Sequence, residues 1–166
     1  MPDKNGNTAL YKAAAGGDIN IVKLLIEKKA DINSTNTYGY TPLFEALQFK
    51  KNEIVVLLIS IGADVNISNN KGRSLLHWAA EQGNKDTVKL LLDNGAFINA
   101  TDSDGHGPVY YAAKKGNVEI VKFLYEKGKC RTRQINSVAN SAALHLHRLF
   151  ATLCLSKAKK ICNSHI

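Results

Sequence analysis

The sequence predicts an all-α fold in which four tandem pairs of helices are followed by one further helix near the C-terminus. Three observations support this fold class. The 166 residues show a period of 33, and rows of that length align four glycines at Gly6, Gly39, Gly72 and Gly105. Hydroxyl residues that start helices recur with the same period, as do apolar residues at helical spacing. One helix pair cannot bury its apolar face alone, whereas stacked pairs can.

Each period contains a polar turn, a short Ala-rich segment, a Gly or Lys, a longer segment of the type IVKLL and a closing stretch of the type GADVN. The period stops after Gly128, where KCRTR replaces the closing stretch, and Val138 stands where the glycine of a fifth repeat would lie. We therefore expect an array over 3–134, with repeats at 3–35, 36–68, 69–101 and 102–134, and a basic helical tail over 135–166.

The first helix of each pair is expected to begin at a hydroxyl cap. In the second repeat Thr41 precedes Pro42, whose missing amide hydrogen costs nothing at the first helical position. Thr8 and Ser74 supply the cap in the first and third repeats. Small residues follow midway through this helix, where they let neighbouring helices approach closely, at Ala13-Ala14, Ala46-Leu47, Ala79-Ala80 and Ala112-Ala113.

The second helix of each pair is predicted from apolar residues that recur at helical spacing. In the first two repeats these are Ile21, Val22, Leu24 and Leu25, and then Ile54, Val55, Leu57 and Leu58. We expect them to form one buried apolar face.

The motifs TPLF, SLLHWAA, EIVKFL, VKLLL, GADVN and GAFIN, with a GN or GD after the first helix, resemble those of ankyrin repeats. The resemblance covers Asp3 to Gly128. It implies that each repeat has a β-hairpin loop followed by two antiparallel helices, stacked into an L-shaped solenoid. It also implies a protein-binding scaffold whose hairpins and first helices form a concave surface, with no catalytic centre in the repeat.

The resemblance further implies that the positions that vary between repeats carry recognition. These positions lie at the hairpin tip and at the exposed end of the first helix. The residues expected to contact a protein partner are Tyr38, Tyr40, Gln48, Phe49, Lys71, Arg73, Glu81, His106, Lys114 and Lys115. Tyr and Arg are enriched in binding hot spots. The alternative is that the aromatic residues pack on adjacent hairpins and only cover the array.

Two lysines depart from the repeat pattern. Lys50 replaces the glycine between the two helices, and Lys29 replaces the glycine after the second helix. A residue other than glycine in a left-handed turn costs on the order of 1 kcal/mol. We expect either slight strain at these positions or a reshaped turn.

Other conspicuous residues are expected to have structural roles. Trp78 should cover its helix pair, and the imidazole of His77 should bond to a neighbouring turn. The resemblance implies that asparagines in the closing stretches stabilise the hairpins, with hydroxylation by an asparaginyl hydroxylase as the alternative role, at Asn33, Asn66 and Asn99.

The motifs of several enzyme classes are missing from the sequence. It has no nucleophile elbow, HExxH motif, Walker loop or zinc-finger pairing, and its acidic residues do not converge on one segment. We therefore expect no enzyme activity, no cofactor, no metal and no small-molecule substrate.

Charge separates the array from the tail. Of 22 Lys and Arg residues, 15 lie in 1–128 with all 14 acidic residues, so the array is close to neutral and its charge does not indicate nucleic-acid binding. The other seven are Lys129, Arg131, Arg133, Arg148, Lys157, Lys159 and Lys160. Three Cys without CxxC spacing fit a reducing compartment. With no signal-peptide pattern at the start of the sequence, we expect a cytoplasmic protein.

Heavy use of Lys, Asn and Ile indicates an AT-rich genome. The chain also resembles small ankyrin proteins of intracellular bacteria, some of which act in host cells. Delivery into a host cell is therefore a second expectation for its location.

Three hypotheses compete for the tail, which should form a helix over Ser141 to Lys160. It is a C-terminal cap on the array, a degenerate end of a longer array, or a basic segment that binds nucleic acid or an anionic membrane. A zinc site from Cys154, Cys162 and His165 is disfavoured because the Cys spacing is unlike a zinc knuckle.

Overall fold

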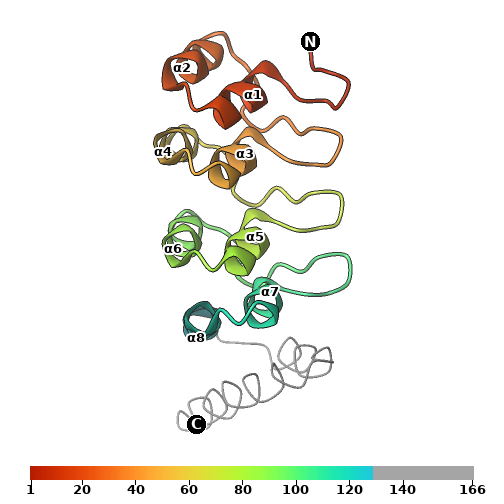
Figure 1. The fold of residues 1–166 in the computed structure, drawn as a ribbon, viewed down its shortest axis with the longest axis vertical. Coiled ribbons are helices and arrows are strands. Elements are labelled where there is room, and N and C mark those ends of the chain that lie inside the picture. Colours follow the sequence, from red (N-terminus) through yellow and green to blue (C-terminus); the bar gives the residue numbers. More distant parts are fainter. Residues whose placement is uncertain (129–166) are drawn as a thin grey trace, which may run out of the picture. The chain divides into compact units, whose positions relative to one another are not determined.

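The computed structural model describes residues 1–128, which form eight α-helices arranged in antiparallel pairs (Figure 1). The first helices of the pairs are α1 (Ala9–Gly16), α3 (Pro42–Gln48), α5 (Leu75–Gln82) and α7 (Pro108–Lys114). The second helices are α2 (Ile19–Glu27), α4 (Asn52–Ser60), α6 (Lys85–Asp93) and α8 (Val118–Gly128). Within the described residues no β-strand is present, and the loops between pairs are built from turns.

The helices follow the sequence period closely. The first helices begin at residues 9, 42, 75 and 108 and the second helices at 19, 52, 85 and 118, so both sets recur every 33 residues. The predicted all-α class with paired helices is therefore confirmed. The described residues divide into two compact units: unit 1 is residues 1–71 with α1 to α4, and unit 2 is residues 72–128 with α5 to α8.

The same packing scheme builds each unit. In unit 1, α1 packs on α3 and each first helix packs on its own second helix; in unit 2, α5 packs on α7 in the same way. Fully buried alanines lie on these first helices, where small side chains allow close approach, and they are Ala14, Ala46, Ala79, Ala80 and Ala112. Most of the predicted small-residue positions thus lie in the core, whereas Ala13 and Ala113 are half-buried.

The second helices match the predicted apolar face only in part. Val22, Ile54 and Leu58 are fully or almost fully buried, but Ile21 is 48% exposed and Leu24 is 52% exposed. The prediction of burial is wrong for these last two residues. In unit 1, α2 packs on α1 and α4, and these two contacts leave Ile21 and Leu24 on the uncovered side of the helix.

Caps fix the helix ends as expected. The hydroxyl oxygen of Thr8 accepts from the Tyr11 amide at 3.2 Å, and that of Thr41 accepts from the Phe44 amide at 3.2 Å. Pro42 occupies the first turn of α3. In the third repeat the cap is reciprocal, because the Ser74 side chain accepts from the His77 amide while the Ser74 amide donates to Nδ1 of the His77 ring at 3.0 Å.

Lys29 and Lys50 keep the left-handed backbone of the glycines that they replace, with φ of 61° and 54°. After α3, the Lys50 amide bonds to the Leu47 carbonyl at 3.1 Å and the Lys51 amide bonds to the Ala46 carbonyl at 2.8 Å. These two bonds define a Schellman motif, which requires a left-handed residue at this position. The turn is therefore strained and not reshaped. Gly128 differs from its counterparts Gly62 and Gly95, because it is the last residue of α8 and its φ is not left-handed.

Several predictions concern residues outside the described range. These are the end of the fourth repeat, the tail over 135–166 with its helix at Ser141 to Lys160, and the disfavoured site at Cys154, Cys162 and His165. Within residues 1–128, the helices are too short or too polar to cross a lipid bilayer.

Candidate functional site

An Asp or Asn at the start of each repeat folds the hairpin loop. The side-chain oxygen accepts hydrogen bonds from the amides two and four residues later, at 2.8 to 3.0 Å, in the loops that begin at Asp3, Asn36 and Asp102. Asn69 accepts the first of these bonds, from Lys71 at 3.0 Å. These Asp and Asn residues recur with the 33-residue period but were not among the residues predicted from the sequence.

Successive loops are also hydrogen-bonded to one another in unit 1. The Thr37 amide donates to the Asn5 carbonyl at 3.0 Å, and the Asn70 amide donates to the Tyr38 carbonyl at 3.2 Å. Asn70 adds a side-chain bond to the Thr37 carbonyl at 2.9 Å. The backbone that carries Tyr38 is therefore fixed on both sides.

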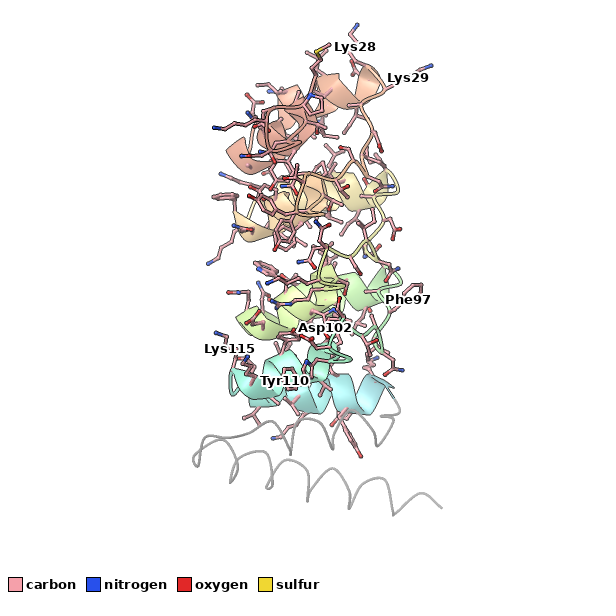
Figure 2. The ribbon with its side chains drawn as sticks, turned by 90° about the vertical axis from the view of Figure 1, so that its right-hand side faces the viewer. Lys28, Lys29, Phe97, Asp102, Tyr110 and Lys115 are labelled. Carbon is pink, nitrogen blue, oxygen red and sulfur yellow. The ribbon has the colours of Figure 1, made fainter. Side chains whose placement is uncertain are left out.

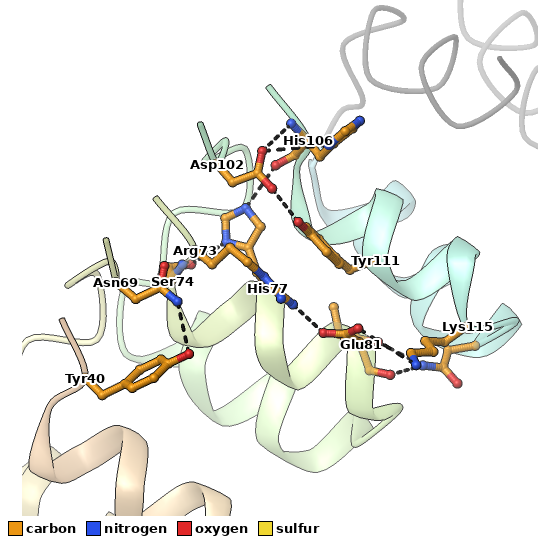
Figure 3. Close-up of polar contacts among 12 residues, drawn as sticks. Tyr40, Asn69, Arg73, Ser74, His77, Glu81, Asp102, His106, Tyr111 and Lys115 are labelled. Carbon is orange, nitrogen blue, oxygen red and sulfur yellow. Dashed lines mark hydrogen bonds and ion pairs between the residues drawn. The ribbon is translucent and has the colours of Figure 1, made fainter. Parts of the chain in front are cut away.

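Tyr40 attaches its loop to the helix that follows. Its ring stacks on Phe44 of α3 with 4.1 Å between ring centroids. Its hydroxyl accepts a hydrogen bond from the Asn69 side chain at 3.3 Å (Figure 3). The side chain is half-buried. Of the two interpretations offered for the aromatic residues, packing describes the observed contacts of Tyr40.

Tyr38 and Phe49 are instead exposed. Tyr38 at the second loop is 60% exposed, and Phe49 at the end of α3 is 51% exposed, beside the exposed Gln48. Large exposed apolar side chains are concentrated in unit 1, with Met1, Ile21, Leu24, Tyr38, Phe49, Val56 and Ile61, whereas the described part of unit 2 has Phe97. An exposed aromatic ring on a fixed backbone is suited to contact a partner, because little freedom is left to lose.

In unit 2 the predicted contact residues Arg73 and Glu81 form an ion pair (Figure 3). The Arg73 guanidinium also lies over the ring of Tyr111, 4.1 Å from its centroid. Lys115 lies 3.9 Å from the second carboxylate oxygen of Glu81 and is exposed. Arg73 and Glu81 are half-buried, so Lys115 is the exposed member of this group.

Asp102 and Tyr111 form a buried hydrogen bond beside this ion pair. Burial alone would raise the pKa of Asp102, but hydrogen bonds from the Tyr111 hydroxyl and the His106 and Asp104 amides hold it below its usual value. Burial and the bond to Asp102 raise the pKa of Tyr111. The carboxylate of Asp102 thus joins the fourth loop to α7.

His106 stacks on Tyr110 with 3.8 Å between ring centroids, four residues apart like Tyr40 and Phe44. A loop-to-helix stack is therefore found in both units. The Lys114 ammonium lies 6.0 Å from the centroid of Tyr110 and is exposed.

His77 is fully buried and has partners on both ring nitrogens. Nδ1 accepts from the Ser74 amide at 3.0 Å, which assigns the proton to Nε2, and Nε2 donates to the His106 carbonyl at 3.1 Å. Burial lowers the pKa of His77. The expected bond from His77 to a neighbouring turn is confirmed. Trp78 is half-buried.

The asparagines of the closing stretches differ in their settings. The Asn33 side chain accepts from the Asp64 amide at 2.9 Å and so links two successive closing stretches. Asn66 is half-buried and Asn99 is exposed. A structural role is observed at Asn33, and hydroxylation stays a hypothesis.

Phe97 was missed by the sequence analysis and is 66% exposed. It takes the place of Asp31 and Asp64, whose side chains accept from the amides two residues later at 2.9 and 2.8 Å. The third repeat thus has an exposed aromatic ring where its sister repeats have a turn-forming carboxylate. Figure 2 shows Phe97 and Lys115 on opposite sides of unit 2. The contrast between GAFIN and GADVN was the available signal.

One group of potential metal ligands is found in the described part of the chain. Ligand atoms of Asp102, Asp104 and His106 lie within 4.8 Å of one another. Both carboxylate oxygens of Asp102 already accept hydrogen bonds, from two loop amides and from Tyr111. Loop folding accounts for this cluster.

Comparison with protein families gives one match. The family described as Ankyrin repeats (3 copies) matches residues 1–69 and 49–137. Together the two ranges cover most of the chain. A search of curated proteins found no match.

Proposed function

The chain belongs to the ankyrin-repeat family, whose members are typically non-catalytic binding modules, and we propose that it is a scaffold that binds a protein partner through its hairpin loops and first helices. The family suggests protein partners in general. For this chain we propose the contact surface, the residues that make contact and the absence of catalysis.

The observation that carries this proposal is the exposure of Tyr38 and Phe49 on a rigid support. The loop of Tyr38 is bonded to the loops on both sides, and Phe49 directly follows the last turn of α3. Aromatic rings that are held in place bring a large apolar area to an interface at a low entropic cost.

The ten predicted contact residues fall into two groups by exposure. Six are exposed and are proposed to touch the partner, namely Tyr38, Gln48, Phe49, Lys71, Lys114 and Lys115. Four are half-buried and are proposed to shape the surface beneath them, namely Tyr40, Arg73, Glu81 and His106.

Affinity capture with the full chain tests the proposal. The double variant Tyr38→Ala with Phe49→Ala should lose proteins that the unaltered chain retains, because each hot-spot truncation costs about 2 kcal/mol or more. The matched control is Val56→Ala with Ile61→Ala, which removes two exposed apolar side chains of the same repeat, one from α4 and one from its C-cap. Capture that is unchanged in the first variant, at an unchanged melting temperature, would remove Tyr38 and Phe49 from the interface.

A second candidate function rests on the charge of 129–166, which has seven basic and no acidic residues. Such a segment is suited to tether the array to nucleic acid or to an anionic membrane. A variant with all seven residues replaced by Gln should lose salt-sensitive sedimentation with phosphatidylserine vesicles or retention on DNA. Equal binding by both proteins would contradict this candidate.

A further inference from the structure

The hairpin loops and first helices of unit 1, residues 3–17, 36–50 and 69–71, are called the unit 1 face. We propose that the unit 1 face recognises an acidic protein segment that also carries a large apolar side chain. This inference rests on the proposed function and names the chemistry of the partner.

The unit 1 face has four lysines against two carboxylates, and each carboxylate has a hydrogen-bonding partner within the face. Asp3 forms an ion pair with Lys12 at 2.9 Å and accepts from two loop amides. Glu45 accepts a hydrogen bond from the Tyr11 hydroxyl at 2.6 Å. The Lys12 bond leads the contacts that lower the pKa of Asp3, so this carboxylate is charged and matched at neutral pH.

Three ammonium groups of the same face have no such match. Lys4 lies in the first loop, Lys50 follows α3 and Lys71 lies in the third loop, and all three are exposed. Within residues 1–128, the ion pairs do not include them. A partner that binds this face therefore has to supply the negative charge for these three lysines.

The rest of unit 1 carries the opposite excess. Its second helices and closing stretches have five acidic residues, Asp18, Glu27, Asp31, Glu53 and Asp64, against four lysines, Lys23, Lys28, Lys29 and Lys51. The net charge of residues 1–128 is thus close to zero although the unit 1 face and the rest of unit 1 differ in the sign of their charge. The three lysines without an ion pair and the exposed rings of Tyr38 and Phe49 thus belong to the same face.

This combination favours a peptide over a nucleic acid. Tyr38 and Phe49 offer apolar area, and the lysines of this face that have no ion pair are only three, from three separate segments. Tight non-specific binding to nucleic acid depends on neutralising many phosphates at once. An acidic segment with one apolar anchor needs only a few charges and one contact area.

The experiment selects random 12-residue peptides displayed on phage against the immobilised full-length protein. Enriched peptides should carry net negative charge and at least one aromatic or large aliphatic residue. A synthetic enriched peptide, measured by fluorescence polarisation at low salt, should bind the variant Lys4→Glu with Lys71→Glu at least about tenfold more weakly, because two attractions become repulsions. The matched control is Lys23→Glu on α2 with Lys28→Glu at the C-cap of α2. It changes the net charge equally and should stay within about twofold.

The outcomes separate this inference from the proposed function. Enriched peptides that are neutral or basic but lose binding in the Tyr38→Ala with Phe49→Ala variant would overturn the acidic specificity and leave the proposed function standing. Peptides that bind the Tyr38→Ala with Phe49→Ala variant as tightly as the unaltered chain would contradict the proposed function as well. A labelled 12-nucleotide thymidine strand that binds more tightly than any peptide, and depends on Lys4 and Lys71, would overturn the inference in favour of nucleic acid.

Discussion

At the scale of single residues, the left-handed lysines show how far a backbone motif can override a side-chain preference. Lys29 and Lys50 each take a conformation that costs an L-residue on the order of 1 kcal/mol. The Schellman bonds at the helix ends hold them there. Unit 1 therefore contains two strained positions that the sister repeats avoid by using glycine.

Relieving this strain should stabilise the protein. We expect Lys50→Gly to raise the free energy of unfolding by about 1 kcal/mol, measured by urea denaturation. The reciprocal control is Gly62→Lys, which should lower it by a similar amount, since φ is +93° and a Cβ there meets nothing within 4 Å. Destabilisation by Lys50→Gly would show that the lysine side chain makes contacts worth more than the strain.

The buried His77 gives a pH dependence with a defined sign. Its folded pKa lies below the ordinary value of 6.5, so the unfolded chain takes up the proton first as pH falls. The free energy of unfolding should therefore decrease as the pH drops from 7.5 through 6.5 towards 5.

Chemical denaturation at pH 7.5, 6.5 and 5.5 measures this slope. His77→Gln should flatten it. The window stays above the range in which Asp102, with its lowered pKa, begins to contribute. A slope that survives His77→Gln would assign the effect to other groups.

At the scale of elements, the hairpin loop is the part whose rigidity supports the proposed function. Asn36 holds the second loop by accepting from the Tyr38 and Tyr40 amides at 3.0 Å, and it donates to the Asn7 side chain at 3.1 Å. The loop around Tyr38 is thus fixed by a side chain that lies beneath it.

Removing that side chain should loosen the loop before the helices. In Asn36→Ala we expect faster hydrogen exchange at the Tyr38 and Tyr40 amides and a loss of about 1 to 2 kcal/mol in unfolding free energy. The amides in the middle of α3 should keep most of their protection. Thr35→Ala, at the exposed neighbouring position, serves as the control. Unchanged exchange at Tyr38 would show that the bonds to the adjacent loops suffice.

The sequence predicted the elements well because their signals are local. Thr41 and Pro42 start α3 wherever the helix packs, and the period carries this position to the other repeats. Burial of Ile21 was predicted wrongly because α2 and α4 look alike in sequence, while only the packing of neighbours decides which side is covered. The stack of Tyr40 on Phe44 was missed for a similar reason, since it depends on how a loop meets a helix.

At the scale of the whole molecule, two compact units share one repeat design. Repeat arrays draw their stability from neighbouring interfaces, so damage is expected to spread mainly to adjacent repeats. Leu58 in α4 and Leu91 in α6 are fully buried and lie one period apart. They form a matched pair for testing how far the units unfold independently.

Leu58→Ala and Leu91→Ala should each cost about 2 to 5 kcal/mol. We expect native-state hydrogen exchange to show the larger loss of protection in α1 to α4 for the first variant and in α5 to α8 for the second. An equal loss across residues 1–128 in both variants would mean that the two units unfold as one.

The hydrogen bonds between successive loops also constrain how the gene can change. The Thr37 amide meets the Asn5 carbonyl, and the Asn70 amide meets the Tyr38 carbonyl, so each loop has to present the right residue to the next. A single inserted or deleted codon within these loops shifts one partner out of register and breaks the bond. Whole periods can be gained or lost without this penalty. Lineages of this protein should therefore differ in length by complete repeats far more readily than by single residues in the loops.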